Sequence, residues 1–338
     1  MNKEMCRKMN NLDVNANSKN TSIENISIEN AGEENTGKKN KRVYKKEDLK
    51  EQLHSMGLTG SETILIHSSM KAIGNVEGRA DTVLDVWMDY FSKGLLLLPT
   101  HTWKTVNADN PIYNPLETPS CVGILTNLFM KREGVIRSLH PTHSMAGYGE
   151  NAARYLAGEE YNNTPCTPGG CYDRLKEVNG KVLLVGVGHE RNTYIHSVEE
   201  VLNIPNRLSD KPMELAITFS KSAGKDKLPV YGGNDKYIKN IENVLKSKNQ
   251  DSGVDNSNDK DKVYRKVYVR KHYNAQQPHI SEDFVKLNKV FLDCGVVRKV
   301  KFGDADSLLC DARGMFEVVR YVLAKEPECI VTKKNCYS

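Results

Sequence analysis

The chain has 338 residues, 38% of them hydrophobic and 27% charged, with a formal net charge of +5 at pH 7. This length can bury the core of one large domain or of two small ones. The small net charge, without an arginine-rich stripe, argues against a nucleic-acid partner, and no apolar run reaches the roughly 18 residues that span a bilayer. Eight scattered cysteines without a CxxC pair, and an N-terminus without an apolar signal core, predict a cytoplasmic protein with reduced thiols.

Two segments are too polar to join a core. Residues 1–42 are rich in Asn, Lys, Glu and Ser, so they cannot bury enough surface to offset the entropy of ordering. We predict a disordered tail there. Residues 246–262 form a second polar run, which we predict to be an insertion loop within a single domain that covers residues 43–330.

Helices and strands are predicted to alternate between these segments. In chain order they are a helix at 46–56, a strand at 63–66, a helix at 81–90 capped by Asp81, a strand at 95–98, a helix at 123–131, a strand at 181–187, a helix at 193–202, a strand at 267–269, and helices at 284–294 and 312–323. Apolar strands without polar alternation, separated by helices, indicate an α/β fold with a layered sheet flanked by helices on both faces.

Histidines follow three of the predicted strands. His67, His101 and His189 each come directly after an apolar run, and the segment 138–144 adds His140 and His143. Ligands of open α/β sheets bind beyond the carboxyl ends of the strands. If the three strands are parallel neighbours, their histidines converge at that edge, which predicts a site with several titratable groups.

Other site types have weaker support in the sequence. No HExxH, HxH or clustered cysteines are present, so we predict no metal site, although a metal-dependent hydrolase remains an alternative use of the histidines. The turn Gly186-Val187-Gly188 lacks the third glycine and the later acidic residue of a dinucleotide site. Its glycines are expected to allow a sharp turn close to a ligand.

Polar side chains near these turns suggest ligand contacts. On the helix at 193–202, His196, Glu199 and Glu200 share one face, which would offer carboxylates to a cationic substrate or simply face solvent. The hydroxyl-rich segments 68–71 and 140–144 suit phosphates or a pantetheine arm, while Ser68 alone would also suit a helix cap.

Four stretches of the chain, 67–74 (HSSMKAIG), 97–102 (LLPTHT), 137–144 (RSLHPTHS) and 181–193 (KVLLVGVGHERNT), resemble those of the aminoglycoside 3-N-acetyltransferases (antibiotic N-acetyltransferases). The resemblance implies an α/β fold distinct from the common small acetyltransferase fold. It also implies His189 and His67 as catalytic histidines. By the matching motifs, acetyl-CoA would be held by Ser68, Ser69, Met70, Lys71, Ser138, Thr142 and Ser144.

The chain departs from the family pattern in its charges. The family commonly has Asp-Ser after the GVGH histidine, whereas this chain has Glu190 and Arg191. The extra positive charge fits poorly with a polycationic antibiotic. Glu282 and Asp283 are the best match to the acidic residues with which the family engages its antibiotic.

The predicted reaction is direct acetyl transfer from acetyl-CoA to the 3-amino group of an aminoglycoside. The substrate amine must lose a proton before it attacks, and His189 is predicted to be the general base, oriented by Glu190 or Glu282. Donors around Ser68 and Ser69 would stabilise the oxyanion, with His67 either positioning the thioester or relaying the proton.

Three alternatives stay open: acyl transfer to a different amine, which Arg191 favours; a metal-dependent hydrolase; and a binding module without activity. A small-molecule amine is the expected partner, with neither nucleic acid nor membrane. The oligomeric state, monomer or homodimer, is left open.

Overall fold

The computed structural model describes residues 42–149, 151–205, 207–220, 262–271 and 281–325. Apart from Arg42 and Lys262, the predicted tail and the predicted insertion loop lie outside the described residues. Their assignment, and the boundary of the domain, therefore stay predictions.

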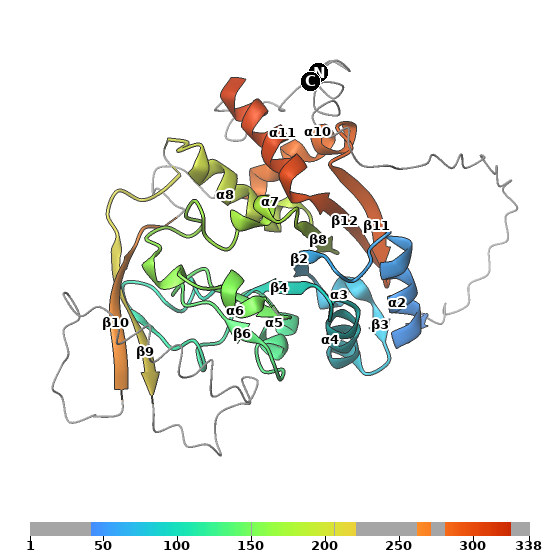
Figure 1. Cartoon of the computed structure of the whole chain (residues 1–338), viewed down its shortest axis with the longest axis horizontal. Helices are drawn as coiled ribbons and strands as arrows, with labels where there is room; N and C mark the ends of the chain where they lie inside the picture. Colours follow the sequence, from blue (N-terminus) through green and yellow to red (C-terminus); the bar gives the residue numbers. More distant parts are fainter. Residues whose placement is uncertain (1–41, 150, 206, 221–261, 272–280, 326–338) are drawn as a thin grey trace, which may run out of the picture. The chain divides into compact units, whose positions relative to one another are not determined.

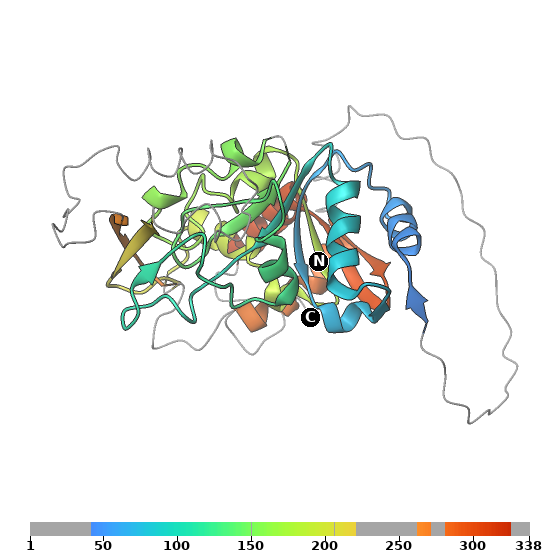
Figure 2. The ribbon, with the colours of Figure 1, turned by 90° about the horizontal axis from the view of Figure 1, so that it is seen from below.

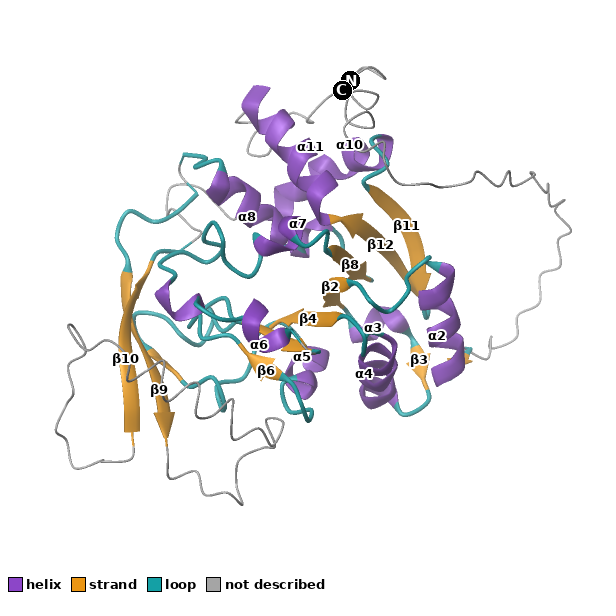
Figure 3. Cartoon of the chain, in the orientation of Figure 1, coloured by secondary structure: helices purple, strands orange, loops and turns teal. Residues whose placement is uncertain are grey.

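A seven-stranded mixed sheet forms the centre of the fold, in the order β11-β12-β8-β2-β4-β7-β6 (Figures 1 and 3). Its strands are β2 (Thr63–Ser68), β4 (Leu95–Pro99), β6 (Ile136–Arg137), β7 (Met145–Tyr148), β8 (Lys181–Val185), β11 (Val297–Phe302) and β12 (Ala305–Asp311). The three strands that precede the predicted histidines lie side by side, because β2 pairs in parallel with both β4 and β8. Antiparallel pairing then adds β12 beside β8 and β7 beside β4.

Two smaller sheets accompany the central one. The first is a parallel pair of β1 (Val43–Tyr44) and β3 (Asn75–Val76). The second has the order β10-β9-β5 and consists of β5 (Ile112–Tyr113), β9 (Met213–Ser220) and β10 (Lys262–Val269).

Helices pack on both sides of the central sheet, as the sequence predicts (Figure 2). The α-helices are α2 (Lys46–Ser55), α3 (Met70–Ile73), α4 (Arg79–Tyr90), α5 (Ile124–Phe129), α6 (Ala152–Tyr155), α7 (Arg174–Glu177), α8 (Tyr194–Val201), α10 (Asn288–Asp293) and α11 (Ala312–Lys325). Short 3₁₀ helices are η1 (Glu159–Tyr161), η2 (His189–Arg191) and η3 (Ser281–Leu287). None of the helices within the described ranges is long and apolar enough to cross a membrane.

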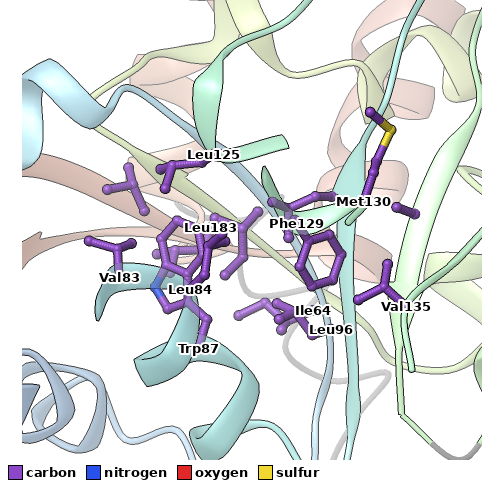
Figure 4. Close-up of a cluster of buried hydrophobic side chains, with 14 of the residues drawn as sticks. Ile64, Val83, Leu84, Trp87, Leu96, Leu125, Phe129, Met130, Val135 and Leu183 are labelled. Carbon is purple, nitrogen blue, oxygen red and sulfur yellow. The ribbon is translucent and has the colours of Figure 1, made fainter. Parts of the chain in front are cut away.

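The main core lies between the sheet and helices α2, α4 and α5. Alternate residues of the parallel strands, such as Ile64, Leu96 and Leu183, point into it together with Trp87 and Phe129 (Figure 4). All five side chains are fully buried. Because β2, β4 and β8 are covered on both faces, their sequences are continuous apolar runs. The polar residues therefore begin only near the end of each strand.

Two predictions about local structure were wrong. Helix α4 begins at Arg79 after Gly78, whose φ of 72° is left-handed, so Asp81 is not its cap; the Asp81 carboxylate instead pairs with Arg132 at 2.7 Å. The sequence prediction also omitted several strands, including β6, β7, β11 and β12 of the central sheet. Lysines and arginine occupy the exposed positions of β11 at the edge of the sheet, which hides the apolar signal of that hairpin.

Candidate active site

A cavity of about 840 Å³ opens beyond the carboxyl ends of the three parallel strands. Its lining includes Ser68 from the end of β2, Pro99 from β4 and Val187 from the turn after β8. Four histidines also line it: His67, His101, His143 and His196. Of the three histidines expected to converge at this edge of the sheet, His67, near the end of β2, and His101, beyond β4, line the cavity.

His67 lies in the wall of the cavity and is only 6% exposed. Burial lowers the pKa of its imidazole to about 3, and its buried Nε2 has no hydrogen-bond partner among the described residues. The ring is therefore neutral at pH 7. A neutral imidazole with so low a pKa is a weak base, but it can offer a hydrogen bond to a ligand.

His101 and His143 form a second group in the cavity wall. Their ring centroids are 4.6 Å apart, and His101 Nε2 lies 2.6 Å from the hydroxyl oxygen of Tyr172. His140, by contrast, is fully buried and belongs to the framework. Its Nδ1 accepts from the backbone N–H groups of Thr142 and His143, so Nε2 must carry the proton and donates to Thr164 O at 3.0 Å.

The segment 137–144 is held in place by a buried arginine. The Arg137 guanidinium donates to both Thr100 oxygens, to Ser144 Oγ and to the carbonyl oxygens of Pro115 and Thr118. Ser138 Oγ accepts from Met145 N at 3.0 Å.

The cofactor contacts expected from this segment are thus only partly supported by the geometry. Ser138 and Ser144 are buried, at 2% and 0% exposure, and face this network. Only Thr142 of the three predicted residues lines the cavity.

The other predicted cofactor residues follow β2. Ser68 lines the cavity, whereas Ser69 caps α3, accepting from Ala72 N at 3.4 Å. Met70 and Lys71 lie in the first turn of that helix and are not part of the cavity lining.

His189 is not in the cavity wall. Its ring is 1% exposed, lies 4.9 Å from the ring of Phe291, and has Nδ1 at 3.1 Å from the Asn192 amide nitrogen. Burial lowers its pKa to about 4. The turn at Gly186, with φ of 64°, and the 3₁₀ helix that follows bring Glu190 and Arg191 into the lining instead.

His196 has a carboxylate partner. Its Nδ1 donates to Glu199 Oε2 at 2.9 Å, and its ring lines the cavity. Arg207 Nε donates to the other oxygen of Glu199 at 2.7 Å. Burial alone would raise the pKa of Glu199, but the hydrogen bonds and positive charges of His196 and Arg207 outweigh it and hold that pKa below its usual value.

The acidic face predicted on this helix does not form a free surface for a substrate. Glu199 is 1% exposed and engaged by His196 and Arg207, while Glu200, 9% exposed, accepts from Thr164 Oγ1 and from Cys166 N. Both carboxylates are turned inward because nearly every residue of α8 is buried. The His-x-x-Glu spacing of positions 196 and 199 indicates that these two side chains can pair. The sequence gives no comparable sign of Arg207, which pairs with the same carboxylate.

The remaining predicted acids have different surroundings. Glu190 lines the cavity, and its Oε1 accepts from Gly188 N at 3.0 Å. Asp283 pairs with Lys286 at 2.8 Å and is not part of the lining. The side chain of Glu282 lies outside the described residues.

Within the described ranges, neither a cysteine thiol nor a metal site offers an alternative catalytic centre. Burial raises the pKa of the Cys121 thiol in the cavity wall, and raises the pKa values of Cys166 and Cys171 well above their usual range. None of these thiols is activated as a nucleophile. No group of three or more His, Cys, Asp or Glu side chains in the described residues is arranged to hold a metal ion.

Comparison with known proteins identifies the family. A family model described as aminoglycoside 3-N-acetyltransferase matches residues 65–324. The chain belongs to the aminoglycoside 3-N-acetyltransferase family. The resemblance seen in the four sequence stretches is thereby confirmed.

Similar members of this family are known by sequence. Aminoglycoside N(3)-acetyltransferase VII of Streptomyces paromomycinus is 28% identical over 177 residues, which cover 47% of this chain and 61% of the relative. Aminoglycoside N(3)-acetyltransferase IV of a Salmonella species is 28% identical over 163 residues, covering 48% and 61%. The chain thus matches less than two thirds of the length of these relatives.

Solved structures show the same fold over more of the chain. The acetyltransferase AAC-IIIb in a binary complex with CoASH has a TM-score of 0.63 at 18% identity, covering 84% of this chain and 97% of its own. The apoenzyme AAC(3)-IVa has a TM-score of 0.64 at 18% identity, covering 88% and 97%.

Proposed function

We propose that the protein is an acetyl-CoA-dependent N-acetyltransferase in which His196, held by Glu199, is the general base. The observation that carries the proposal is a histidine in the cavity wall whose Nδ1–H is fixed by a buried carboxylate. Such a pair orients the ring and stabilises the imidazolium that forms when Nε2 takes a proton. His189, which the sequence favoured, is enclosed by protein and has a pKa of about 4, so it suits this role less well.

The cavity has the properties that acetyl-CoA requires. Its volume of about 840 Å³ can admit an extended ligand, and Lys104, Arg191, Arg270 and Lys271 offer positive charge to phosphates. Ser68 and Thr142 are the predicted cofactor residues that we retain, since both line the cavity. Acetyl-CoA would supply the activated thioester carbonyl.

In a direct transfer, His196 and His67 would have separate roles. The acceptor nitrogen would form a bond to the carbonyl carbon as the carbon–sulfur bond breaks, and the amine proton would pass to His196 Nε2 and from there to the departing thiolate, so that CoA leaves as the thiol. His67, neutral and buried in the wall, would donate a hydrogen bond to the carbonyl oxygen as it gains charge. The raised thiol pKa of Cys121 supports transfer without a covalent enzyme intermediate.

Aminoglycosides are the acceptors that the names of the relatives suggest. Acyl transfer to another amine is the second candidate, because Arg191 enters the cavity lining while Glu199 and Glu200 are engaged elsewhere. A cytoplasmic location, and a monomer or homodimer, remain our expectations.

A thiol-release assay with acetyl-CoA and a panel of amines tests the proposal. We expect release of CoA that depends on both the protein and an amine. Calorimetry should detect acetyl-CoA binding without an acceptor. Absence of both binding and amine-dependent release would refute the proposed function.

A further inference from the structure

Asn192 has a buried polar atom without a partner. The residue lines the cavity although it is only 1% exposed, and its Oδ1 is buried with no hydrogen-bond partner among the described residues. A buried acceptor that is left unpaired costs free energy, so such an atom in a folded protein needs an explanation. Because Asn192 belongs to the cavity lining, a ligand in the cavity can supply the missing donor.

The other end of the Asn192 amide is held by the protein. Its Nδ2 donates to His189 Nδ1 at 3.1 Å and to Met315 Sγ at 3.7 Å. Burial lowers the pKa of His189 to about 4, so its ring is neutral at pH 7 and can accept this hydrogen bond. Both contacts engage the donor end of the planar amide, which leaves Oδ1 as the atom for a ligand.

Asn192 lies four residues before His196, and both residues line the cavity. Ile195 N donates to Asn192 O at 3.1 Å, so the turn that leads into α8 begins at Asn192. Side chains three or four residues apart on such a turn are neighbours. An amine that gives its proton to His196 therefore lies close to the Asn192 amide.

We propose that Asn192 Oδ1 accepts a hydrogen bond from the attacking amine and thereby selects primary amines. This inference rests on the proposed acetyl transfer. A neutral primary amine has two N–H groups and one lone pair on its nitrogen. One N–H faces His196 Nε2 and the second donates to Asn192 Oδ1, which aims the lone pair at the carbonyl carbon. The second hydrogen stays on the nitrogen and becomes the N–H of the product amide, so the proton balance of the transfer is unchanged.

A secondary amine cannot satisfy both side chains. Methylation of the reacting nitrogen leaves one N–H, which must face His196 for proton transfer. Asn192 Oδ1 then stays unpaired beside a methyl group. A site built to bond a substrate N–H discriminates against an analogue that lacks it, so transfer to the methylated amine should be slow.

Acceptors that differ only by methylation give the first test. With saturating acetyl-CoA and the full-length chain, thiol release is measured for kanamycin, for 1,4-diaminobutane, and for the derivative of each in which every amino nitrogen carries one methyl group. We expect methylation to lower kcat/KM by roughly 10-fold or more, which we call the methyl penalty. Equal kcat/KM values for a parent amine and its methylated derivative would overturn the inference.

Variants of Asn192 give the second test. Asn192→Leu keeps the size of the side chain but removes Oδ1, and it should lower kcat/KM for the primary amine by roughly 10-fold and reduce the methyl penalty to less than about 3-fold. KM for acetyl-CoA should change by less than about 2-fold. Asn192→Asp keeps an acceptor oxygen and should retain the methyl penalty.

Asn288→Leu is the matched control. Asn288 Oδ1 is also buried without a hydrogen-bond partner in the described part of the chain, but Asn288 is not part of the cavity lining. This variant should keep the kcat/KM and the methyl penalty of the wild type.

The methyl penalty separates a substrate contact from a structural role. If Asn192 only supports the fold, Asn192→Leu will slow both amines equally and keep the wild-type penalty, which would overturn the inference and leave acetyl transfer standing. A rise in KM for acetyl-CoA alone would overturn it as well, because Oδ1 would then serve the coenzyme. If Asn192→Leu does not fold, loss of the penalty in Asn192→Asp has the same consequence. Absence of amine-dependent thiol release together with absence of acetyl-CoA binding would refute the transfer function itself.

Discussion

Replacing Glu199 by Gln tests whether this carboxylate is an internal support and not a substrate contact. The substitution keeps the shape of the side chain but leaves the Arg207 guanidinium, only 4% exposed, opposite a neutral amide. Breaking a buried ion pair from one side costs about 3–5 kcal/mol, and the retained amide oxygen favours the lower end. A loss of about 3 kcal/mol lowers the melting temperature of a domain of this size by roughly 6–12 °C.

Thermal unfolding followed by circular dichroism measures this loss. Glu317→Gln is the matched control, because Glu317 pairs with Arg320 at 2.6 Å on the exposed side of α11. An exposed pair contributes up to about 1 kcal/mol, so the control should melt within about 4 °C of the wild type. Equal melting temperatures for the two variants would refute the reasoning.

Three further changes follow from the described contacts. Arg137→Lys should cost about 2–4 kcal/mol in thermal unfolding, because an ammonium cannot replace the five donor contacts of the guanidinium; an unchanged melting temperature would contradict this. Gly186→Ala should lower the free energy of unfolding by about 3 kcal/mol or more, since φ at Gly186 is +64° and the new Cβ would lie 2.2 Å from Ala72 Cβ. The control Gly169→Ala, at φ +78° with no atom within 4 Å, should lower it by only about 1 kcal/mol. Similar losses in the two variants would argue against the clash. The free energy of unfolding should fall from pH 7 to pH 5, because the unfolded chain protonates His67 and His189 below about pH 6.5, whereas the folded chain keeps them neutral down to about pH 3 and about pH 4. Each histidine contributes a loss of about 2 kcal/mol over this range, so His67→Asn should show a shallower pH dependence in denaturant titrations. The same pH dependence in the variant and the wild type would contradict this prediction.

The strands of the parallel centre could be predicted because they are buried on both faces. Their sequences, such as Leu95–Pro99 and Lys181–Val185, have no polar alternation to confuse the pattern. The edge strand Val297–Phe302 could not be predicted in the same way, because exposed lysines interrupt its apolar residues. Pairing with Ala305–Asp311, and not local sequence, makes it a strand.

The position of the candidate site could be predicted from the sequence, but the roles of its residues could not. The end of each parallel strand could be read from the sequence, and His67 and His101 do lie together in the cavity wall. The burial of His189 depends on Phe291, about a hundred residues later in the chain, a contact that local patterns do not contain.

The same limit applies to the carboxylates of α8. Their spacing shows that His196 and Glu199 share a face, but not whether that face is solvated. Arg207 and Thr164, which engage Glu199 and Glu200, come from loops outside the helix. These tertiary contacts hold Glu199 and Glu200 inside the protein, where the sequence had predicted a surface for the substrate.

Acetyl-CoA turnover of His196→Gln beside His189→Gln is the most direct test of the proposed base. Both variants are assayed by thiol release with the best acceptor, below their melting temperatures, and acetyl-CoA binding is measured by calorimetry. We expect His196→Gln to lower kcat by roughly 10²–10⁴-fold with acetyl-CoA binding retained, and His189→Gln to lower it by less than about 10-fold. Near-normal kcat for His196→Gln with a large loss for His189→Gln would contradict it.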